Sequence, residues 1–280
     1  IQLTRISPEE VELGEVIDEG ATAKVYKARW NGKTVAVKEM QHTRKNQIMY
    51  KREVAIHRSL SHPNIVQFFG IHIDPRRLWI VMEYAELGSL AKLYEEHRAE
   101  TAHTAFKLTD AARLQIVNEL ADVLHYLHGR SPAIIHHDIK AENVLLDGEG
   151  HVKLCDFGLS VQRGSRLPAG TQGRGTPLWS PEEVLQQSGV VDEKVDVYSF
   201  GLVCWSLWAL REPFSEFTDL KKFVAAMCND HIRPTFGEGW NNNVCQLINW
   251  CWNPNPDQRP AASLLLGQCR ALAGELPISC

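Results

Sequence analysis

The chain contains 280 residues, of which 44% are hydrophobic and 23% are charged. This length and composition are typical of an ordinary globular protein with a core large enough for one large domain or two lobes. Its 30 basic and 34 acidic residues give a net charge of -4, which argues against a nucleic-acid binder because affinity for polyanions comes mainly from clustered cations.

The cysteines and the apolar segments indicate the compartment. The seven cysteines have no compact repeated spacing, and Cys204, Cys251 and Cys269 lie in apolar segments, so we expect buried thiols in a reducing, cytoplasmic environment. The longest apolar segment, 197–210, has about fourteen residues, whereas a helix that crosses a bilayer needs roughly twenty. We therefore predict a buried helix and no membrane insertion. The chain begins at Ile1 without a basic and then apolar leader, so we expect a segment of a longer protein whose regulatory domains or partners lie outside it.

The first eighty or so residues predict a small antiparallel sheet with one helix. Segments with β-type composition, bounded by Gly, Asn-Gly and Asp-Pro turn signals, occur at 24–30, 33–40, 65–73 and 77–84. Between the second and third of these, the segment 44–60 carries Val54, Ile56 and Leu60 near helical spacing. It ends before Pro63, because proline disfavours a continued helix.

The remainder of the chain predicts helices. Thr109 and Asp110 resemble a helix cap, and apolar residues follow at helical spacing, namely Leu114, Val117, Leu120, Val123, Leu124 and Leu127. Further helices are expected at 195–210, 220–228, 241–252 and 261–272. The predicted fold class is therefore α+β, with one domain over 1–280 made of a small β-rich N-lobe (1–82), a hinge (83–88) and a larger, mainly helical C-lobe (89–280).

Two charged residues in the first lobe form a candidate phosphate-binding pair. Lys38 ends an alternating strand, so its side chain can contact phosphate oxygens if an acid fixes its direction, and Glu53 on the predicted helix is the candidate acid. At ~4 Å and an effective dielectric of about 20, such a pair gains on the order of 4 kcal/mol of gross attraction before desolvation is subtracted. A surface lysine and a solvated glutamate are the alternative for either residue alone.

A second group of polar residues lies at 136–158, which reads HHDIKAENVLLDGEGHVKLCDFG. In-line phosphoryl transfer needs a base for the hydroxyl proton and metal to neutralise the triphosphate. Asp138 is the candidate base, a role that typically contributes about 10²- to 10⁴-fold to the rate. Asn143 and Asp156 are candidate magnesium ligands, and Lys140 would lie beside the transferred phosphate.

These motifs, in this order, resemble the catalytic domain of eukaryotic-type protein kinases. The resemblance extends over nearly the whole chain and includes GTPLWSPEE at 175–183. DVYSFG at 196–201 and CWNPNPDQRP at 251–260 are most like the tyrosine-kinase-like group of serine/threonine kinases. The resemblance implies a bilobal protein-kinase-like fold. It also implies a serine/threonine protein kinase that transfers the γ-phosphate of ATP to hydroxyls of a protein substrate with the help of Mg²⁺.

The resemblance further implies roles for single residues. Catalytic roles fall to Lys38, Glu53, Asp138, Lys140 and Thr176, and metal ligation falls to Asn143 and Asp156. Nucleotide binding is implied for Ile17, Gly20, Val25, Ala36, Lys38, Met82, Glu83, Ala85, Asn143, Leu145 and Asp156. Met82 would be the gatekeeper, backbone groups of Glu83 and Ala85 would bind adenine, and apolar side chains would sandwich the ring. Taken alone, each of these apolar residues is better interpreted as a core residue.

The chain departs from the family pattern at two places. Asp18, Gly20 and Ala23 stand where three glycines are usual, so the close approach of backbone N–H groups to phosphates is weakened. His137 replaces the arginine that commonly binds a phosphorylated activation segment, and a mostly neutral imidazole would do this poorly. We therefore expect that changing Ser165 and Thr171 to alanine leaves at least half of the activity.

Two further contacts follow from the matching positions. Asp196 would anchor the backbone of the catalytic loop, and Glu182 would form a buried ion pair with Arg259. His136 and Phe157 are interpreted as packing residues.

Other functions remain open at this point. A pseudokinase, which binds nucleotide or partners without catalysis, is favoured by Asp18, Ala23 and His137. A dual-specificity kinase is disfavoured by Lys140 and Thr176, which match serine/threonine kinases. A zinc site built from His125, His128, His136 and His137 lacks a nearby Cys or acidic residue to complete the ligand set.

Overall fold

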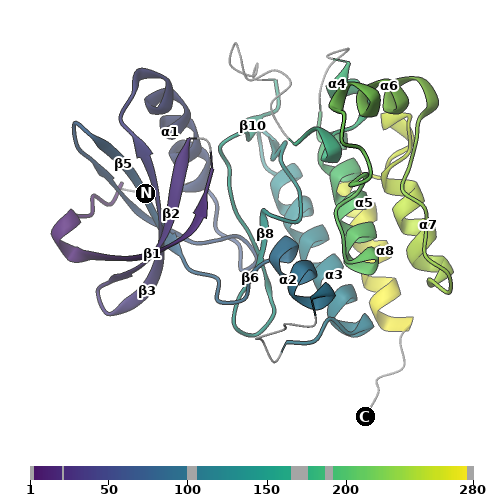
Figure 1. Cartoon of the computed structure of the whole chain (residues 1–280), viewed down its shortest axis with the longest axis horizontal. Coiled ribbons are helices and arrows are strands. Elements are labelled where there is room, and N and C mark those ends of the chain that lie inside the picture. The colour runs from purple at the N-terminus through teal and green to yellow at the C-terminus, as the bar shows by residue number, and fades with distance from the viewer. Residues whose placement is uncertain (1–2, 21, 100–105, 165–175, 187–191, 276–280) are drawn as a thin grey trace.

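The protein has two lobes, seen side by side in the computed structural model (Figure 1). The structure describes residues 3–20, 22–99, 106–164, 176–186 and 192–275. One lobe is built around a twisted sheet and the other around packed helices, so the predicted α+β fold class is confirmed.

The sheet of the N-lobe has five antiparallel strands in the order β1-β2-β3-β5-β4. Their bounds are β1 (Val11–Glu19), β2 (Ala23–Trp30), β3 (Lys33–Gln41), β4 (Phe68–Ile73) and β5 (Arg77–Glu83). A short 3-10 helix, η1 (Pro8–Glu10), precedes the first strand. The four predicted strands are present, and β4 begins later than expected. Ile65 and Val66 turn away to meet the other lobe, where the Val66 N–H donates to the Leu154 carbonyl over 3.0 Å.

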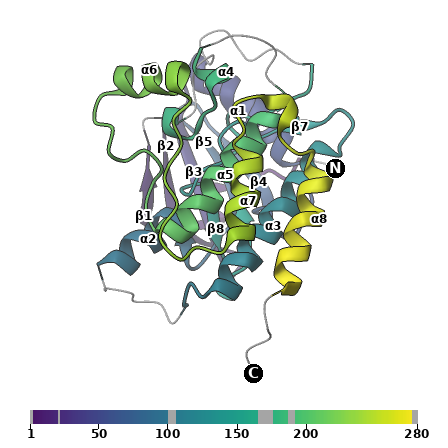
Figure 2. The ribbon, with the colours of Figure 1, turned by 90° about the vertical axis from the view of Figure 1, so that its right-hand side faces the viewer.

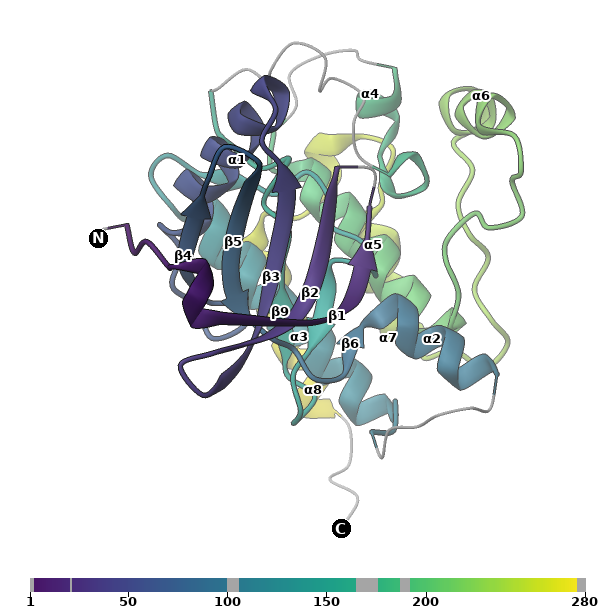
Figure 3. The same cartoon turned by 60° about the vertical axis from the view of Figure 1, so that its left-hand side comes forward.

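The helix α1 (Arg44–His57) connects β3 to β4 and lies at the β4–β5 side of the sheet (Figure 3). Thr43 caps it by accepting a hydrogen bond from the Asn46 N–H over 3.2 Å. The Tyr50 hydroxyl donates to the Trp79 carbonyl on β5 over 3.0 Å, which holds the buried face of α1 against the sheet. The helix ends at His57 rather than at residue 60, because the chain turns there with Leu60 N–H bonded to the His57 carbonyl.

The C-lobe consists mainly of helices. They are α2 (Leu90–Arg98), α3 (Asp110–His128), α4 (Glu182–Leu185), α5 (Lys194–Ala209), α6 (Leu220–Asp230), α7 (Asn242–Cys251) and α8 (Ala262–Glu275). α3 packs against α8 and α5 packs against α7, and Figure 2 shows this group of helices from the C-lobe side. The predicted helices are all present, whereas α2 and α4 were not predicted.

Short strands and turns lie between the lobes and hold the polar segment 136–158. These are β6 (Gly88–Ser89), β7 (Ile134–Ile135), β8 (Val144–Leu146), β9 (Val152–Leu154) and β10 (Val161–Gln162). Two 3-10 turns, η2 (Pro177–Trp179) and η3 (Pro256–Gln258), belong to the C-lobe, where they contact α6 and α5. β8 and β9 form a hairpin, with β6 on the other side of β8. This hairpin places Asn143 just before β8 and Asp156 just after β9.

The apolar segment 197–210 forms a buried helix, as predicted. Nearly every side chain of α5 is inaccessible to solvent, including Phe200, Val203 and Trp205. The cysteines Cys204, Cys251 and Cys269 are buried free thiols, which agrees with the sequence. Among the described residues, no helix combines the length and the apolar character that crossing a membrane requires.

Candidate active site

Lys38, Glu53 and Asp156 meet at the junction of the two lobes. The Lys38 Nζ lies 2.7 Å from the Glu53 Oε1 and 2.9 Å from the Asp156 Oδ1. β3 supplies the lysine, α1 the glutamate and the turn after β9 the aspartate. The predicted ion pair between Lys38 and Glu53 is therefore present, and α1 holds its glutamate turned inward.

The opposite charges of Lys38 and Asp156 stabilise each other. Burial disfavours the charged amine of Lys38, but the charges of Asp156 and Glu53 outweigh burial and raise the pKa of Lys38 above its usual value. Burial would raise the pKa of Asp156, yet the neighbouring Lys38 ammonium outweighs burial and lowers it. Burial raises the pKa of Glu53, and Lys38 opposes this. The stable arrangement is a charged Lys38 bound to an ionised Asp156.

Gly158 allows the carboxylates to approach this closely. Its N–H donates to the Asp156 Oδ1 over 3.1 Å. A Cβ at this position would lie 3.0 Å from the Asp156 Oδ1 and 3.4 Å from the Glu53 Oε2. Because such contacts are tighter than ordinary side chains tolerate, the glycine gives the room that the two carboxylates occupy.

The candidate catalytic residues Asn143 and Lys140 converge on Asp138. The Asn143 Nδ2 donates to the Asp138 carbonyl over 2.8 Å and to its Oδ2 over 2.9 Å. The Lys140 Nζ lies 3.4 Å from the Asp138 Oδ2 and donates to the Thr176 Oγ1 over 2.8 Å. Since the amide nitrogen of Asn143 binds Asp138, its amide oxygen is the atom left for a metal ion. An amide oxygen and the Asp156 carboxylate are ligand types that suit Mg²⁺.

Asp196 anchors the backbone of this loop, as predicted. Its carboxylate accepts hydrogen bonds from the N–H groups of His136, over 2.8 Å, and His137, over 2.9 Å. His137 has a positive φ of 66°, a conformation that a non-glycine residue keeps only when its surroundings hold it. Burial lowers the pKa of His137, which favours the neutral imidazole expected from the sequence.

His128, one of the residues in the zinc alternative, contacts the same carboxylate. Its Nε2 lies 2.9 Å from the Asp196 Oδ2. In the part of the chain that the structure describes, no three His, Cys, Asp or Glu side chains are grouped so as to hold a metal ion.

Phe157 and His136 pack together, as expected, with a third ring that the sequence did not reveal. The Phe157 ring lies edge-on to His136 at 4.9 Å between ring centroids and stacks on His57 at 5.2 Å. His57 is buried at the end of α1, and its Nε2 lies 2.6 Å from the Val66 carbonyl oxygen. These rings connect the inner side of α1 to the catalytic loop.

The predicted adenine-binding side chains form one apolar cluster. Ala36 and Met82 are buried in it, and Val25, Leu145 and Cys155 pack against it. Burial raises the pKa of the Cys155 thiol, so this cysteine is the inert apolar neighbour expected from the sequence.

The other nucleotide-binding candidates lie around this cluster. Ile17 on β1 is 43% exposed and is not part of it. Gly20 lies in the hairpin between β1 and β2, where its N–H donates to the Ala23 carbonyl over 2.9 Å. In the hinge, the Glu83 N–H donates to the Gln67 carbonyl over 2.9 Å, so only the Glu83 carbonyl remains for a ligand. Ala85, two residues on, is buried.

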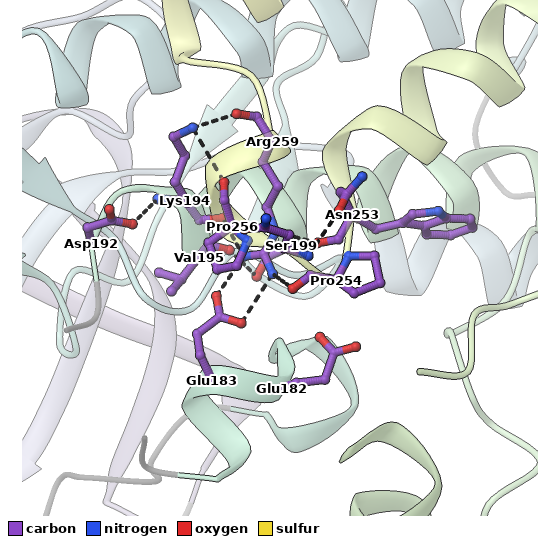
Figure 4. A network of polar contacts seen from close by, with 12 residues as sticks. Glu182, Glu183, Asp192, Lys194, Val195, Ser199, Asn253, Pro254, Pro256 and Arg259 are labelled. Atoms are coloured by element: carbon purple, nitrogen blue, oxygen red, sulfur yellow. Dashed lines mark hydrogen bonds and ion pairs between the residues drawn. The ribbon is translucent and has the colours of Figure 1, made fainter. Parts of the chain in front are cut away.

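The expected ion pair between Glu182 and Arg259 is wrong. The Arg259 guanidinium binds Glu183 instead, with distances of 2.6 Å from Nη1 to Oε1 and 3.1 Å from Nη2 to Oε2 (Figure 4). Glu182 binds Arg233, whose Nη1 lies 2.8 Å from its Oε1. Both glutamates are on α4, where consecutive residues point about 100° apart, so only one of them can face Arg259.

A cavity of about 500 Å³ lies outside the cluster of Lys38, Asp138 and Asp156. It is lined by residues that include Arg58, Leu60, Phe68, Phe69, Glu83 and Lys153. The Lys153 Nζ lies 2.8 Å from the Glu83 Oε1, so an ion pair of the hinge borders this cavity. Val66 and Phe68 in its lining also belong to the apolar cluster of Ala36 and Met82. Ser165 and Thr171 fall outside the described residues.

Comparisons with known proteins agree with this geometry. A family model described as "Protein kinase domain" matches residues 11–268. "Dual specificity protein kinase shkA" of Dictyostelium discoideum is 39% identical over 262 residues, which are 91% of this chain and 48% of that protein. "Serine/threonine-protein kinase CTR1" of Arabidopsis thaliana is 35% identical over 268 residues, 94% of this chain and 32% of that protein. The chain spans about half or less of the length of these relatives.

Proposed function

Because the chain belongs to the protein kinase family, we propose that it transfers the γ-phosphoryl group of ATP to serine and threonine hydroxyls of proteins. The observation that carries the proposal is the convergence of Lys38 on Asp156 and of Asn143 on Asp138. The two segments are joined because the Cys155 N–H donates to the Asn143 carbonyl over 3.0 Å. This supports one site with an ammonium group, a proposed base and two candidate metal ligands.

Each residue has a definite task in this proposal. Lys38, held by Glu53, binds phosphate oxygens of the nucleotide, and Asp138 accepts the proton of the substrate hydroxyl. Asn143 and Asp156 hold Mg²⁺, which when bound neutralises charge on the phosphates. Lys140 is directed by Thr176 towards the transferred group.

The proposed adenine and ribose pocket is formed by Ile17, Gly20, Val25, Ala36, Met82, Glu83, Ala85 and Leu145. We also propose that the hinge at 83–88 connects an N-lobe at 1–82 to a C-lobe at 89–280. Asp18 and Ala23 reduce backbone contact with the phosphates, so we expect modest nucleotide affinity. We also propose a cytoplasmic location, because the cysteines within the described residues are free thiols. Regulatory segments are expected outside this chain.

Serine/threonine specificity is favoured by the hydrogen bond between Lys140 and Thr176. The relative shkA is named a dual specificity kinase, so phosphotyrosine is the specific alternative. Both products require the same catalytic group and differ only in the hydroxyl that reaches Asp138.

The test is a transfer assay with purified protein, labelled ATP, Mg²⁺ and a peptide library that contains Ser, Thr and Tyr, followed by phosphoamino-acid analysis. We expect phosphoserine and phosphothreonine. Asp138→Asn should lower the rate by about 10²- to 10⁴-fold while nucleotide binding persists. Lys38→Met should remove activity. Nucleotide binding without transfer by the wild-type protein would instead indicate a pseudokinase, and phosphotyrosine would indicate dual specificity.

A further inference from the structure

The outward side of α1 is strongly basic, although the chain as a whole is acidic. This helix contains one acidic residue, Glu53, which points inward to Lys38. We define the basic face as the outward cations of α1, which are Arg44, Lys45, Lys51 and Arg52, together with the C-cap residue Arg58. Four cations and no available carboxylate lie on a helix of 14 residues, which is about 21 Å long, and Arg58 directly follows it.

The cations of the basic face are not neutralised within the described residues. Other basic side chains have acidic partners, such as Lys24 with Glu19 at 2.9 Å and Arg113 with Asp110 at 2.7 Å. No such ion pair or side-chain hydrogen bond joins the five cations of the basic face to any other described side chain. An acidic ligand would therefore meet cations whose charge is still uncompensated.

The basic face has an apolar centre. Ile48 is 54% exposed, and Ala55, also exposed, follows seven residues later, so both project from the same side of the helix. With about 100° between successive residues, Lys45 and Arg52 flank this stripe on one side and Lys51 and Arg58 on the other. An apolar stripe between two charged rows is the arrangement by which one helix pairs with another.

Arg58 connects the basic face to a deeper recess. It lines the cavity of about 500 Å³ together with Leu60, Phe68 and Phe69. A ligand that lies along α1 can thus place an apolar side chain into this cavity at the C-terminal end of the helix. The cavity supplies apolar contact area that the stripe of Ile48 and Ala55 lacks on its own.

We propose that the basic face of α1 is a docking surface for an acidic amphipathic helix of a partner protein. In this complex, leucine-like side chains along one side of the partner helix pack on Ile48 and Ala55. Carboxylates of the partner helix lie opposite the cations that flank these two residues. This surface is on the outer side of the helix that carries Glu53, away from the proposed nucleotide pocket, so docking does not compete with ATP.

A protein helix fits this surface better than a membrane or a second copy of the chain. A membrane-bound amphipathic helix needs a broad apolar side with several large residues, whereas the only large exposed apolar residue of α1 is Ile48. A second copy has more acidic residues on β1 than on any other described helix or strand, but a strand repeats every two residues and does not match a stripe with helical spacing.

The test measures binding of a labelled synthetic peptide of about 18 residues, with Leu at helical spacing and Glu elsewhere, by fluorescence anisotropy without nucleotide. The peptide control is a scrambled peptide of the same composition. We expect binding that weakens when salt rises from about 50 mM to about 300 mM, and weaker binding of the scrambled peptide. Because no catalysis is measured, this result is independent of the proposed kinase activity.

Matched variants locate the binding surface. Lys45→Glu combined with Lys51→Glu should weaken binding by about tenfold or more. Lys221→Glu combined with Lys222→Glu, an equal change of charge on exposed positions of α6, should leave binding unchanged. Ile48→Ser should weaken binding about threefold, whereas Leu220→Ser, at a similarly exposed position, should not. Circular dichroism verifies that each variant is folded.

Several results would overturn the proposal. These are absence of peptide binding, equal binding of the scrambled peptide, or equal loss of affinity in the α6 variants. Binding to phosphatidylserine vesicles that depends on Lys45 and Lys51, without peptide binding, would assign the surface to membranes. A wild-type dimer in light scattering that is lost in the Lys45→Glu, Lys51→Glu variant would assign it to a second copy.

Discussion

His57 connects α1 to the rest of the molecule through one ring. It is 2% exposed, stacks on Phe157 and lies edge-on to Phe68. Its Nε2 lies 2.6 Å from the Val66 carbonyl, so the neutral ring donates to this oxygen. Glu53 is one helical turn earlier, which means that the position of His57 also sets the position of the glutamate that holds Lys38.

We expect acid to destabilise the wild-type protein more than a His57→Leu variant. Burial lowers the pKa of His57 from 6.5 to about 4, against the effect of its hydrogen bond to Val66. Between those values the unfolded chain binds a proton that the folded protein does not bind. The stabilisation by His57 is therefore complete above pH 6.5 and falls by about 1.4 kcal/mol per pH unit as the pH drops towards 4.

Urea unfolding of both proteins at about pH 7 and pH 5 measures this effect. The wild-type protein should lose about 2 kcal/mol more than the variant between these pH values. At pH 7 the variant should itself be less stable by about 1–3 kcal/mol, because the Val66 carbonyl loses its donor. Lys38 and Asp156 are present in both the wild-type protein and the His57→Leu variant, so their charges do not account for a difference in pH dependence. Identical pH dependence in the two would contradict the prediction.

Asp196 is the second residue whose effect on the site is indirect. In Asp196→Asn, the side chain keeps one oxygen, which can accept from the N–H of either His136 or His137. Its NH₂ group then faces the second N–H, so two hydrogen-bond donors oppose each other. We expect kcat to fall by about 10²-fold, because a small displacement of Asp138 misplaces the proposed base, while the Kd for nucleotide is nearly unchanged. Asp192→Asn, the same change just before α5, should leave kcat intact. A parallel loss of nucleotide affinity would show general unfolding instead.

Elements with strong patterns were predicted well. α3 (Asp110–His128) and β3 (Lys33–Gln41) agree with the sequence within a residue or two, because a cap and a helical apolar stripe mark the first, and alternating apolar residues mark the second. β1 was missed because it is an edge strand in which only Val11 is buried, and its apolar residues Val11, Leu13, Val16 and Ile17 do not alternate along the whole strand. α2 was missed because its nine residues are short for a periodic signal.

The arrangement of the candidate site was predicted where contacts depend on motif spacing and missed where they depend on packing. Lys38, Asp138 and Asp156 are found by motif, and Asp196 by its place in one. His57 carries no such signal, since its role depends on a carbonyl that approaches it only in the folded protein. Glu182 and Glu183 are adjacent and chemically identical, so only the direction of α4 decides which of them meets Arg259.

The ion pair of Glu183 with Arg259 should therefore stabilise the packing of α4 on the rest of the C-lobe. Arg259 is buried, and its Nε also donates to the Asn253 carbonyl over 2.8 Å. A double-mutant cycle with Glu183→Gln and Arg259→Lys should give a coupling energy of about 1–3 kcal/mol in urea unfolding. The same cycle with Glu182→Gln is the control and should give less than about 0.5 kcal/mol. A larger coupling for Glu182 would contradict the observed pairing.

At the scale of the whole molecule, the lobes are joined by more than the hinge. The segment between α1 and β4 crosses to the C-lobe, where the Ser61 N–H donates to the Tyr126 hydroxyl over 2.9 Å and the Asn64 Nδ2 donates to the Val152 carbonyl over 3.1 Å. Glu83 adds a connection of its own, since one carboxylate oxygen accepts from the Gln67 N–H while the other binds Lys153 on β9. Motion between the lobes must therefore stretch these contacts.

Breaking the Lys153 contact should loosen the hinge and weaken nucleotide binding. In Lys153→Met, the Glu83 carboxylate loses the cation at 2.8 Å, and the backbone carbonyl of the same residue is the proposed adenine contact. We expect the Kd for ATP to rise about threefold, or roughly 0.7 kcal/mol, with stability lowered by about 1 kcal/mol. The measurements are isothermal titration and thermal unfolding.

Lys92→Met is the matched control, because the Lys92 pair with Glu96 is 3.9 Å long and lies within α2, so both values should stay at wild-type level. An unchanged Kd in Lys153→Met would mean that the hinge keeps its geometry without the ion pair, and that the contacts of 61–66 alone hold the lobes in place.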